Sequence, residues 1–394
     1  MSTQVTSETE NIVKIKVIGV GGAGNNVINR MVKSPVAGVE LIAVNSDKAS
    51  LSVSNAQNKV RIGEKLTMGQ GAGSNPEVGR KAAEESRNNI AKVIEGADMM
   101  FIAAGMGGGT GTGAAPVIAE LSRSIGALTV GIVTKPFAFE GKKRMTQALA
   151  GIQELQTKVD SLLVISNDQL RKISEHNLTL ANAFEIADSV LLEAVDCFTD
   201  MVTNVGFINI DFADVCSIMK DAGMAHLGVG RGNGKGRALE AARAAISSPL
   251  LESSIDGACG VLINIIGPSD IGLIEIEEAA TLIKEAAHPT ANIILGASFD
   301  PQMNDGIKIV VIATRFKPSA VPPTKQQVNS APWLNKQLSA NDLYADADPD
   351  PLRVFPPDVP DFIQDPSAVQ PPEPPAASSK DDYWDKLMDI FNSR

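Results

Sequence analysis

The chain has 394 residues but only three cysteines and three histidines. Both residue types are widely spaced, which excludes a disulfide framework and gives no zinc-binding pattern. No apolar run approaches the roughly 18 residues of a membrane span. The first ten residues are polar and acidic, unlike a signal or transit peptide. We therefore expect a cytoplasmic protein without a membrane span and without a metal site built from side chains.

Basic residues are also fewer than acidic ones, with 35 Lys and Arg against 46 Asp and Glu. The net charge of −11 argues against binding of nucleic acid or of an anionic membrane by the body of the protein. Proline is scarce until the end, because 14 of the 22 prolines follow Arg315, together with both tryptophans and both tyrosines. We expect the globular part to end near Phe316. Residues 1–11 and 317–357 are then disordered segments, and residues 358–394 form a tail with too little apolar surface to fold alone.

Glycine, in contrast, is concentrated in one loop. Six of the nine residues from Gly105 to Gly113 are glycine. An apolar strand (98–104) precedes this loop, and a helix (117–125) is expected after it. Glycine allows positive φ and lets an anion approach backbone N–H groups, while a helix N-terminus attracts negative charge. The pattern predicts a phosphate-binding loop, although it is not a P-loop because no Gly-Lys-[Ser/Thr] motif follows it.

The first 50 residues offer an alternative interpretation. A strand (12–20) ends in Gly19, Gly21 and Gly24, which satisfy G-x-G-x-x-G, and a helix is expected over 25–33. The next strand (39–44) ends in Asn45-Ser-Asp47, where a ribose-binding acid would lie. This half alone fits a nicotinamide dehydrogenase. The glycine loop at 105–113 would be a further phosphate-binding segment, which favours a nucleoside triphosphate with a longer phosphate chain.

Further strands and helices alternate along the chain. A glycine-rich loop (69–75) enters a polar helix that we expect to continue to Glu95, and strands at 128–133 and 161–166 are followed by polar loops. This alternation predicts a parallel sheet wound on both faces over residues 12–177. A helix over 178–203 is apolar nearly all round, so we expect it to be buried between this domain and a smaller mixed α/β domain over 204–316.

That second domain opens with an acidic motif. Asn209, Asp211 and Asp214 form Asn-x-Asp-x-x-Asp, with the two acids near one face if a helix begins at Asp211. Taken alone, they also fit favourable acids at a helix N-terminus. A second glycine run, 228–236, lacks a strand–loop–helix setting, so we interpret it as a turn into a helix over 237–246.

The string Gly-Gly-Gly-Thr-Gly-Thr-Gly, with Met106 before it and Ala-Ala-Pro after it, resembles the FtsZ family of tubulin-like GTPases. The resemblance covers residues 12–316 and implies a GTPase domain, a long central helix and a second α/β domain. It also implies binding of GTP or GDP with Mg²⁺. The nucleotide-binding residues would be Gly21, Gly22, Asn25, Asn45, Asp47, Ala72, Gly73, Gly105, Gly107, Gly108, Gly109, Thr110, Gly111, Glu140, Arg144, Asn167, Phe184 and Asp188.

Within that set, Glu140 and Arg144 would serve the sugar and the nucleotide edge, and Asn167, Phe184 and Asp188 the guanine base. A helix of about 24 residues spans roughly 36 Å, so the acidic motif beyond it would not reach the nucleotide of its own chain. The resemblance therefore implies that Asp211 and Asp214, with Asn209, complete the catalytic site of a neighbouring copy. It further implies a head-to-tail filament in the division ring at mid-cell.

The tail carries two segments that resemble or suggest partner-binding peptides. Residues 358–363 resemble the peptide through which FtsZ proteins contact membrane tethers and regulators, although Gln364 replaces the usual arginine. Residues 379–391 begin with a capping box and place apolar residues at helical spacing. Besides the dehydrogenase, two alternatives remain: a plasmid-segregating tubulin-like filament and a non-enzymatic assembly regulator. Both acids of the motif are present, which disfavours the regulator.

Overall fold

The computed structural model describes residues 13–33, 38–170, 179–203, 206–248, 255–300, 303 and 305–316. They all belong to one compact unit of the chain. The expected N-terminal segment (1–11), the linker (317–357) and the tail with its two peptide segments (358–394) lie outside the described residues. Predictions about those parts therefore stay predictions.

The described residues form one ten-stranded sheet with the strand order β3-β2-β1-β4-β5-β6-β7-β10-β8-β9. The strands are β1 (Ile15–Val20), β2 (Val39–Asn45), β3 (Asn58–Arg61), β4 (Met99–Gly105), β5 (Leu128–Lys135), β6 (Ser161–Ser166), β7 (Gly223–Asn233), β8 (Ala258–Gly267), β9 (Asn292–Phe299) and β10 (Gly306–Phe316). The helices are α1 (Gly21–Met31), α2 (Lys48–Ser52), α3 (Glu64–Thr67), α4 (Pro76–Glu85), α5 (Arg87–Ile94), α6 (Thr110–Ser124), α7 (Lys142–Gln156), α8 (Asn167–Leu170), α9 (Leu180–Thr203), α10 (Phe212–Met219), α11 (Arg237–Ile246) and α12 (Leu273–Ala286), with a 3-10 turn η1 (Ala138–Glu140).

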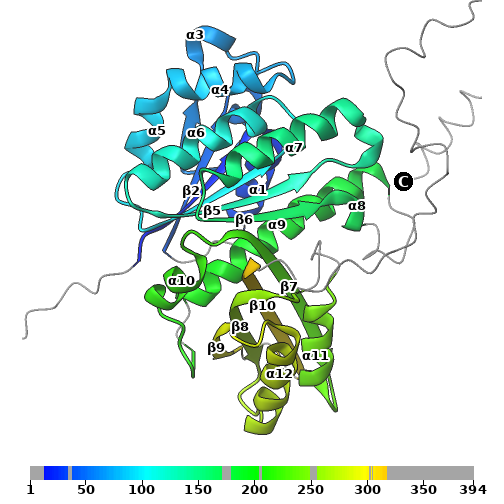
Figure 1. The fold of residues 1–394 in the computed structure, drawn as a ribbon. Helices are drawn as coiled ribbons and strands as arrows, with labels where there is room; N and C mark the ends of the chain where they lie inside the picture. The colour runs from blue at the N-terminus through cyan, green and yellow to red at the C-terminus, as the bar shows by residue number, and fades with distance from the viewer. Residues whose placement is uncertain are drawn as a thin grey trace, which may run out of the picture. The chain divides into compact units, whose positions relative to one another are not determined.

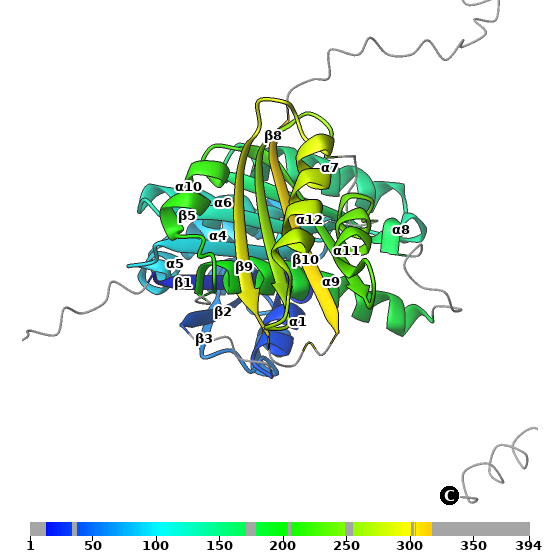
Figure 2. The same ribbon diagram turned by 90° about the horizontal axis from the view of Figure 1, so that it is seen from below.

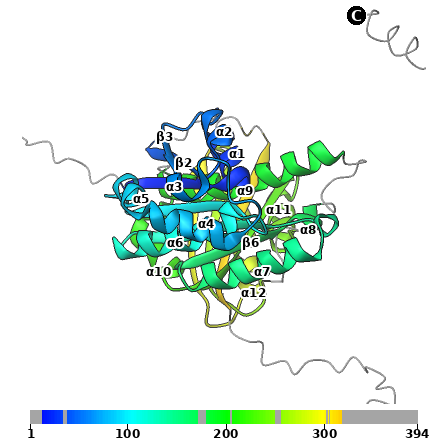
Figure 3. The same ribbon diagram turned by 90° about the horizontal axis from the view of Figure 1, so that it is seen from above.

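Strands β1 to β6 are all parallel, so their carboxyl ends meet at one edge of the sheet. Helices α4, α5, α6 and α7 cover one face (Figure 3), and α1, α2 and α9 cover the other. This confirms the predicted doubly wound α/β architecture. The sequence did not indicate that β7 joins β6 over three residue pairs, which makes the sheet continuous with the antiparallel β7–β10–β8 part.

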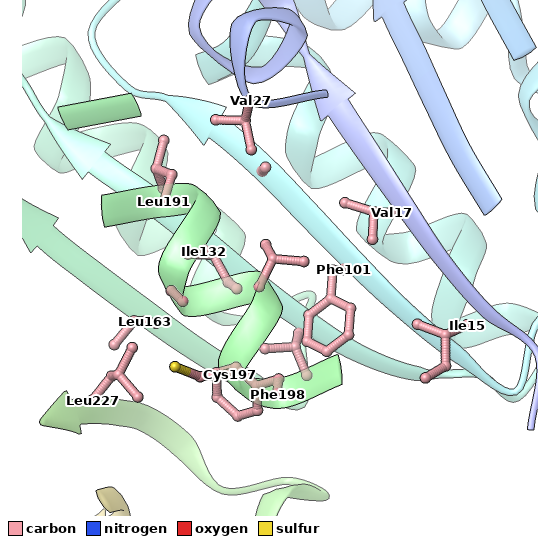
Figure 4. Close-up of a cluster of buried hydrophobic side chains, with 14 of the residues drawn as sticks. Ile15, Val17, Val27, Phe101, Ile132, Leu163, Leu191, Cys197, Phe198 and Leu227 are labelled. Atoms are coloured by element: carbon pink, nitrogen blue, oxygen red, sulfur yellow. The ribbon is translucent and has the colours of Figure 1, made fainter. Parts of the chain in front are cut away.

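The central helix α9 has 24 residues and runs between the parallel strands and the second part of the sheet (Figure 1). Its side chains fill the space beneath the parallel strands. Phe198 lies 5.6 Å from Phe101 of β4, measured between ring centroids, and Leu191 and Cys197 are buried beside them (Figure 4). Burial on this scale stabilises by roughly 1.5–3 kcal/mol per large apolar side chain. The predicted burial of this helix is therefore accounted for by its packing.

Three helix boundaries differ from the sequence prediction. Helix α1 begins at Gly21 rather than Asn25, and α6 begins at Thr110 rather than at residue 117. The glycines that we expected only in loops thus also form the first helical turns. The polar helix expected to reach Glu95 is two helices, α4 and α5, which are interrupted at Ser86. Its hydroxyl accepts a hydrogen bond from the backbone N–H of Gly63 at 3.0 Å.

The expected turn over residues 228–236 was also wrong, because β7 continues to Asn233. Glycine occupies every second position here, which leaves one face of the strand without side chains. A Cβ at Gly228, Gly230 or Gly232 would lie between 1.9 and 2.1 Å from a carbonyl oxygen of α11. The glycines therefore allow the backbone of α11 to lie directly on the strand. In the sequence alone, this run of glycines is typical of a loop.

Candidate functional site

A pocket of about 230 Å³ lies at the carboxyl ends of β4, β5 and β6. Eleven residues of the predicted nucleotide-binding set line it. They are Gly22, Gly105, Gly108, Gly109, Thr110, Gly111, Glu140, Arg144, Asn167, Phe184 and Asp188. The pocket therefore joins the glycine loop after β4, the loop after β5, the end of β6 and the first turns of α9.

The floor of the pocket is formed where two helices begin. The first N–H groups of any helix lack an intrahelical partner. Neither α1 nor α6 has an N-cap side chain that accepts a hydrogen bond from these groups. A Cβ at Gly21 would lie 2.9 Å from the backbone nitrogen of Gly111, so the two helix ends are in close contact. Two uncapped helix N-termini at one point favour an anion such as a phosphate group.

The glycine loop itself is open towards the pocket. Gly107 has a φ of +95°, and a Cβ there would lie 2.7 Å from the backbone oxygen of Arg144. Gly108 has no atom within 4 Å of its Cβ position. The loop is held by the backbone N–H of Met106, which donates to the carbonyl of Thr134 at 2.9 Å. Its peptide groups are thus fixed while space above them remains for a ligand.

Three predicted residues, Asn25, Asn45 and Asp47, are not among those that line the pocket. The buried Asn25 amide, in the orientation that satisfies its neighbours, donates to the carbonyl oxygen of Gly19 at 2.9 Å and accepts from Asn45 at 3.1 Å. The carboxylate of Asp47 caps α2 and accepts from the hydroxyl of Ser50 at 2.6 Å, which lowers its pKa. Asn25, Asn45 and Asp47 therefore shape the loops around the pocket.

The loop before α4 lies against the glycine loop. A Cβ at Gly109 would lie 2.8 Å from the Cβ of Ala72, which is buried. Gly73 is exposed, with a φ of +56° and no atom within 4 Å of its Cβ position. The side chain of Asn75 caps α4 by accepting from the N–H of Glu77. Ala72 and Gly73 are thus adjacent to the pocket but outside its lining.

The far end of the pocket carries an aromatic ring and a carboxylate on α9. Phe184 is 40% exposed, although its place in an apolar stripe also fits a core residue, and it meets Phe137 edge-on at 5.5 Å. Burial raises the pKa of Asp188 to about 6, and Asn26 donates a hydrogen bond to its carboxylate at 3.3 Å. A planar base with adjacent N–H donors fits this combination of an open ring face and a buried acceptor.

Two further groups support a polar ligand. Glu140 forms an ion pair with Arg144 at 3.1 Å, and its other oxygen accepts from the N–H of Phe137. The buried Oδ1 atom of Asn167 has no hydrogen-bond partner within the described part of the chain. A buried acceptor without a partner costs about 1–3 kcal/mol, which a ligand donor would offset.

The acidic motif lies at the opposite end of the sheet. Asp211 caps α10 and accepts from the N–H of Asp214 at 2.7 Å, and Asn209 accepts from the N–H of Gly206 at 2.6 Å. Phe212, between the acids, lines a cavity with Asp98 and Leu128, at the amino ends of β4 and β5. β5 has eight residues and spans about 26 Å from that end to the pocket. One chain therefore does not bring its acids to its own pocket.

Sequence reasoning missed several residues at the site. The additional lining residues are Ala23, Met106, Thr134, Pro136 and Ala187, and Asn26 bonds to Asp188. Thr134 and Pro136 could have been found because ligands bind beyond the carboxyl ends of parallel strands. Ala187 lies three residues after Phe184 on α9, so helical periodicity also indicates it.

Comparisons with known proteins agree with this geometry. Residues 14–175 match the GTPase domain of the Tubulin/FtsZ family, and residues 223–317 match the C-terminal domain of the FtsZ family. The structure of an empty FtsZ dimer from M. jannaschii is 44% identical and superposes with a TM-score of 0.73, covering 77% of this chain and 88% of that one.

Two CetZ structures from Haloferax volcanii share the fold. A GTPγS-bound CetZ2 protofilament is 22% identical with a TM-score of 0.66, covering 78% of this chain and 95% of that one. A GDP-bound CetZ1 monomer is 24% identical with a TM-score of 0.67, covering 76% of this chain and 94% of that one. In the part of the chain that the structure describes, no helix is long and apolar enough to span a membrane.

The FtsZ match covers both parts of the sheet and includes a domain model specific to FtsZ. The dehydrogenase alternative is therefore wrong, and the predicted GTP hydrolysis is confirmed. The chain belongs to the tubulin/FtsZ family of GTPases, and within it to FtsZ.

Proposed function

We propose that this GTPase polymerises head-to-tail into the filaments of the cell-division ring, and that each active site is completed by the acidic motif of the next copy. One observation carries the proposal: the pocket lies at the carboxyl ends of the parallel strands, and Asp211 and Asp214 lie at the amino ends. A contact between unlike ends need not close, so it generates an open filament.

The proposed roles follow the pocket from floor to rim. The glycines of both loops, with Thr110, bind the phosphates through backbone N–H groups, and Ala72 and Gly73 close over them. Glu140 and Arg144 contact the sugar. Phe184 stacks on guanine, and the Asp188 carboxylate accepts from two adjacent N–H groups of that base, which adenine does not offer. Asn25, Asn45 and Asp47 hold the loops in place.

Mg²⁺ fits this arrangement as a partner of the phosphates. Across the described ranges no three acidic, histidine or cysteine side chains come together as a metal cluster. Mg²⁺ commonly keeps its waters and binds substrate phosphates, so such a cluster is not needed. When bound, the ion would offset negative charge on the phosphate oxygens. Asp211 and Asp214 of the next copy would orient and polarise the attacking water.

A mixing experiment tests the shared site. Asp211→Ala removes the catalytic end of a subunit, and Asp188→Ala weakens the nucleotide end. If the site is shared, an equimolar mixture of these two variants recovers about a quarter of wild-type turnover, because a quarter of random contacts pair two intact ends. Turnover of the mixture equal to the mean of the separate variants would contradict a shared site.

A filament outside division is the second candidate, and the likeness to a CetZ protofilament favours it. The division role rests on the FtsZ identity and on residues 358–363, through which we propose that membrane tethers and regulators bind. A fluorescent fusion in the source cells is expected to form a ring at mid-cell, in the cytoplasm. Normal septation after depletion of the protein would contradict the division role.

A further inference from the structure

Strand β3 (Asn58–Arg61) is the outer strand at one edge of the sheet (Figure 2) and pairs with β2 only, as far as the described residues go. The N–H of Ile62 donates to Asn45 of β2 at 3.0 Å. Because backbone groups alternate in direction along a strand, those of Lys59 and Arg61 point away from β2. They form an open edge that could pair with another strand.

An open groove of about 550 Å³ follows this edge. Helix α2 contributes Leu51 from one face of the sheet, and α5 contributes Val93 from the other. Val60 of β3 lies between them and is buried. Figure 3 shows β3 at the edge of the molecule beside α2. Leu51, Val60 and Val93 thus give the groove an apolar part along the open strand edge.

The rim of the groove is basic in a chain with a net charge of −11. Lys48, Lys59 and Lys92 line it, and none forms an ion pair with a carboxylate of the described residues. The fourth cation, Arg61, is bonded to Glu64 at 2.9 Å. Three unneutralised ammonium groups around an open strand edge favour an acidic extended peptide over a compact anion, which would leave the backbone groups unused.

The chain itself contains a segment of matching chemistry. Residues 342–350 read Asp-Leu-Tyr-Ala-Asp-Ala-Asp-Pro-Asp, with four acids and no base in nine residues. In an extended conformation Asp342, Asp346 and Asp348 would share one face, and Leu343 and Ala345 the other. We propose that this groove binds residues 342–350 of a second copy of the chain as an added edge strand.

The consequence for assembly follows from the position of the groove. β3 is the last strand on the outer side of the parallel sheet, away from the order β1-β4-β5-β6 that carries the pocket. A bound segment would join copies through this edge rather than through the two ends of the strands. In filaments this contact would link neighbours sideways. That consequence rests on the proposed filament, whereas the binding itself does not.

The test measures fluorescence anisotropy of a labelled peptide of residues 341–351. The peptide is added to the full-length chain in the presence of GDP. In that chain Asp342, Asp346, Asp348 and Asp350 are changed to asparagine, so that its own segment does not compete with the peptide. We expect saturable binding that weakens about tenfold or more between 50 and 300 mM salt. Because GDP is used, failure of filament formation or of GTP hydrolysis does not affect the result.

Matched variants locate the site. Lys59→Glu with Lys92→Glu should weaken binding about tenfold or more. Lys65→Glu with Lys81→Glu makes the same change in net charge at exposed lysines outside the groove and should leave the affinity within about twofold. Equal losses in both pairs, or no saturable binding at low salt, would overturn the proposal. Lys59 and Lys92 would then serve only to prevent the open strand edge from pairing with other strands.

A variant peptide tests the strand itself. Ala345→Pro keeps all four acids but removes one backbone donor and restricts the chain. We expect clearly weaker binding of this peptide to the same protein. Equal affinity would show that charge alone holds the segment and would overturn the added strand.

Discussion

The Cβ position of Gly21 lies 2.9 Å from the backbone nitrogen of Gly111, so the first turns of α1 and α6 meet at the floor of the pocket. Gly21 also has a φ of +73°. Gly21→Ala should therefore be strained by both the contact and the backbone, at about 1–3 kcal/mol. We expect lower affinity for GDP and a lower melting temperature. Gly272→Ala is the control, because its φ is −79° and its nearest contact an ordinary 3.5 Å.

The buried Asp188 gives GTP binding a predicted pH dependence. Burial raises the pKa of Asp188 to about 6, so its carboxylate is ionised at pH 7.5 and largely protonated below pH 6. Protonation would remove the acceptor that we propose for the N–H groups of guanine. Affinity for a fluorescent GDP analogue should therefore fall as the pH drops through about 6. Asp188→Asn should bind weakly with a flatter profile, and a steep fall that persists in this variant would exclude Asp188 as the titrating group.

A substitution at Asp211 can separate its observed role from its proposed one. Its carboxylate caps α10, and we propose that it also acts on the nucleotide of the next copy. Asp211→Ser keeps a capping side chain but removes the charge. GTP affinity and the melting temperature should stay near wild type while turnover falls about 10²-fold or more. Unchanged turnover in Asp211→Ser would show that this residue only caps the helix.

The glycine stripe of β7 predicts a strong effect on stability. A Cβ at Gly230 would lie 1.9 Å from the carbonyl oxygen of Ala241 in α11, so helix and strand would have to separate. Gly230→Ala should lower the free energy of unfolding by more than about 2 kcal/mol. Val229→Ala, on the other face of the same strand, should cost about 1–2 kcal/mol by loss of methyl groups. Denaturant titration compares the two, and similar small losses would contradict the close packing.

These cases show what the sequence predicts and what it does not. The parallel sheet and the phosphate-binding glycines follow from local patterns, since the glycine segments at 19–24 and 105–113 each end an apolar strand. Glu140, Arg144, Asn167, Phe184 and Asp188 were expected only from the family resemblance. The start of α6 at Thr110 and the strand through residues 228–233 were not predicted. Composition alone does not distinguish a glycine needed for close packing from a glycine in a loop. The hydrogen bonds of Asn25 to the carbonyl oxygens of Gly19 and Gly21 were also not visible in the sequence, because they depend on how the loop folds back on itself.

The separation of the pocket from the acidic motif is the central claim for function. The sequence indicated this separation through the length of α9. The structure adds a second reason: Leu128, at the start of β5, lines the cavity beside the acidic motif, whereas Thr134, near its end, lines the nucleotide pocket. If two copies are needed for one active site, turnover per chain must depend on assembly.

The most direct test is the rate of GTP hydrolysis per chain as a function of protein concentration, with Mg²⁺ present. We expect a threshold concentration, with turnover per chain near zero below it and a constant increment in the rate for each added chain above it. Constant turnover per chain down to the lowest concentration would contradict the shared site, because a single chain would then suffice for catalysis.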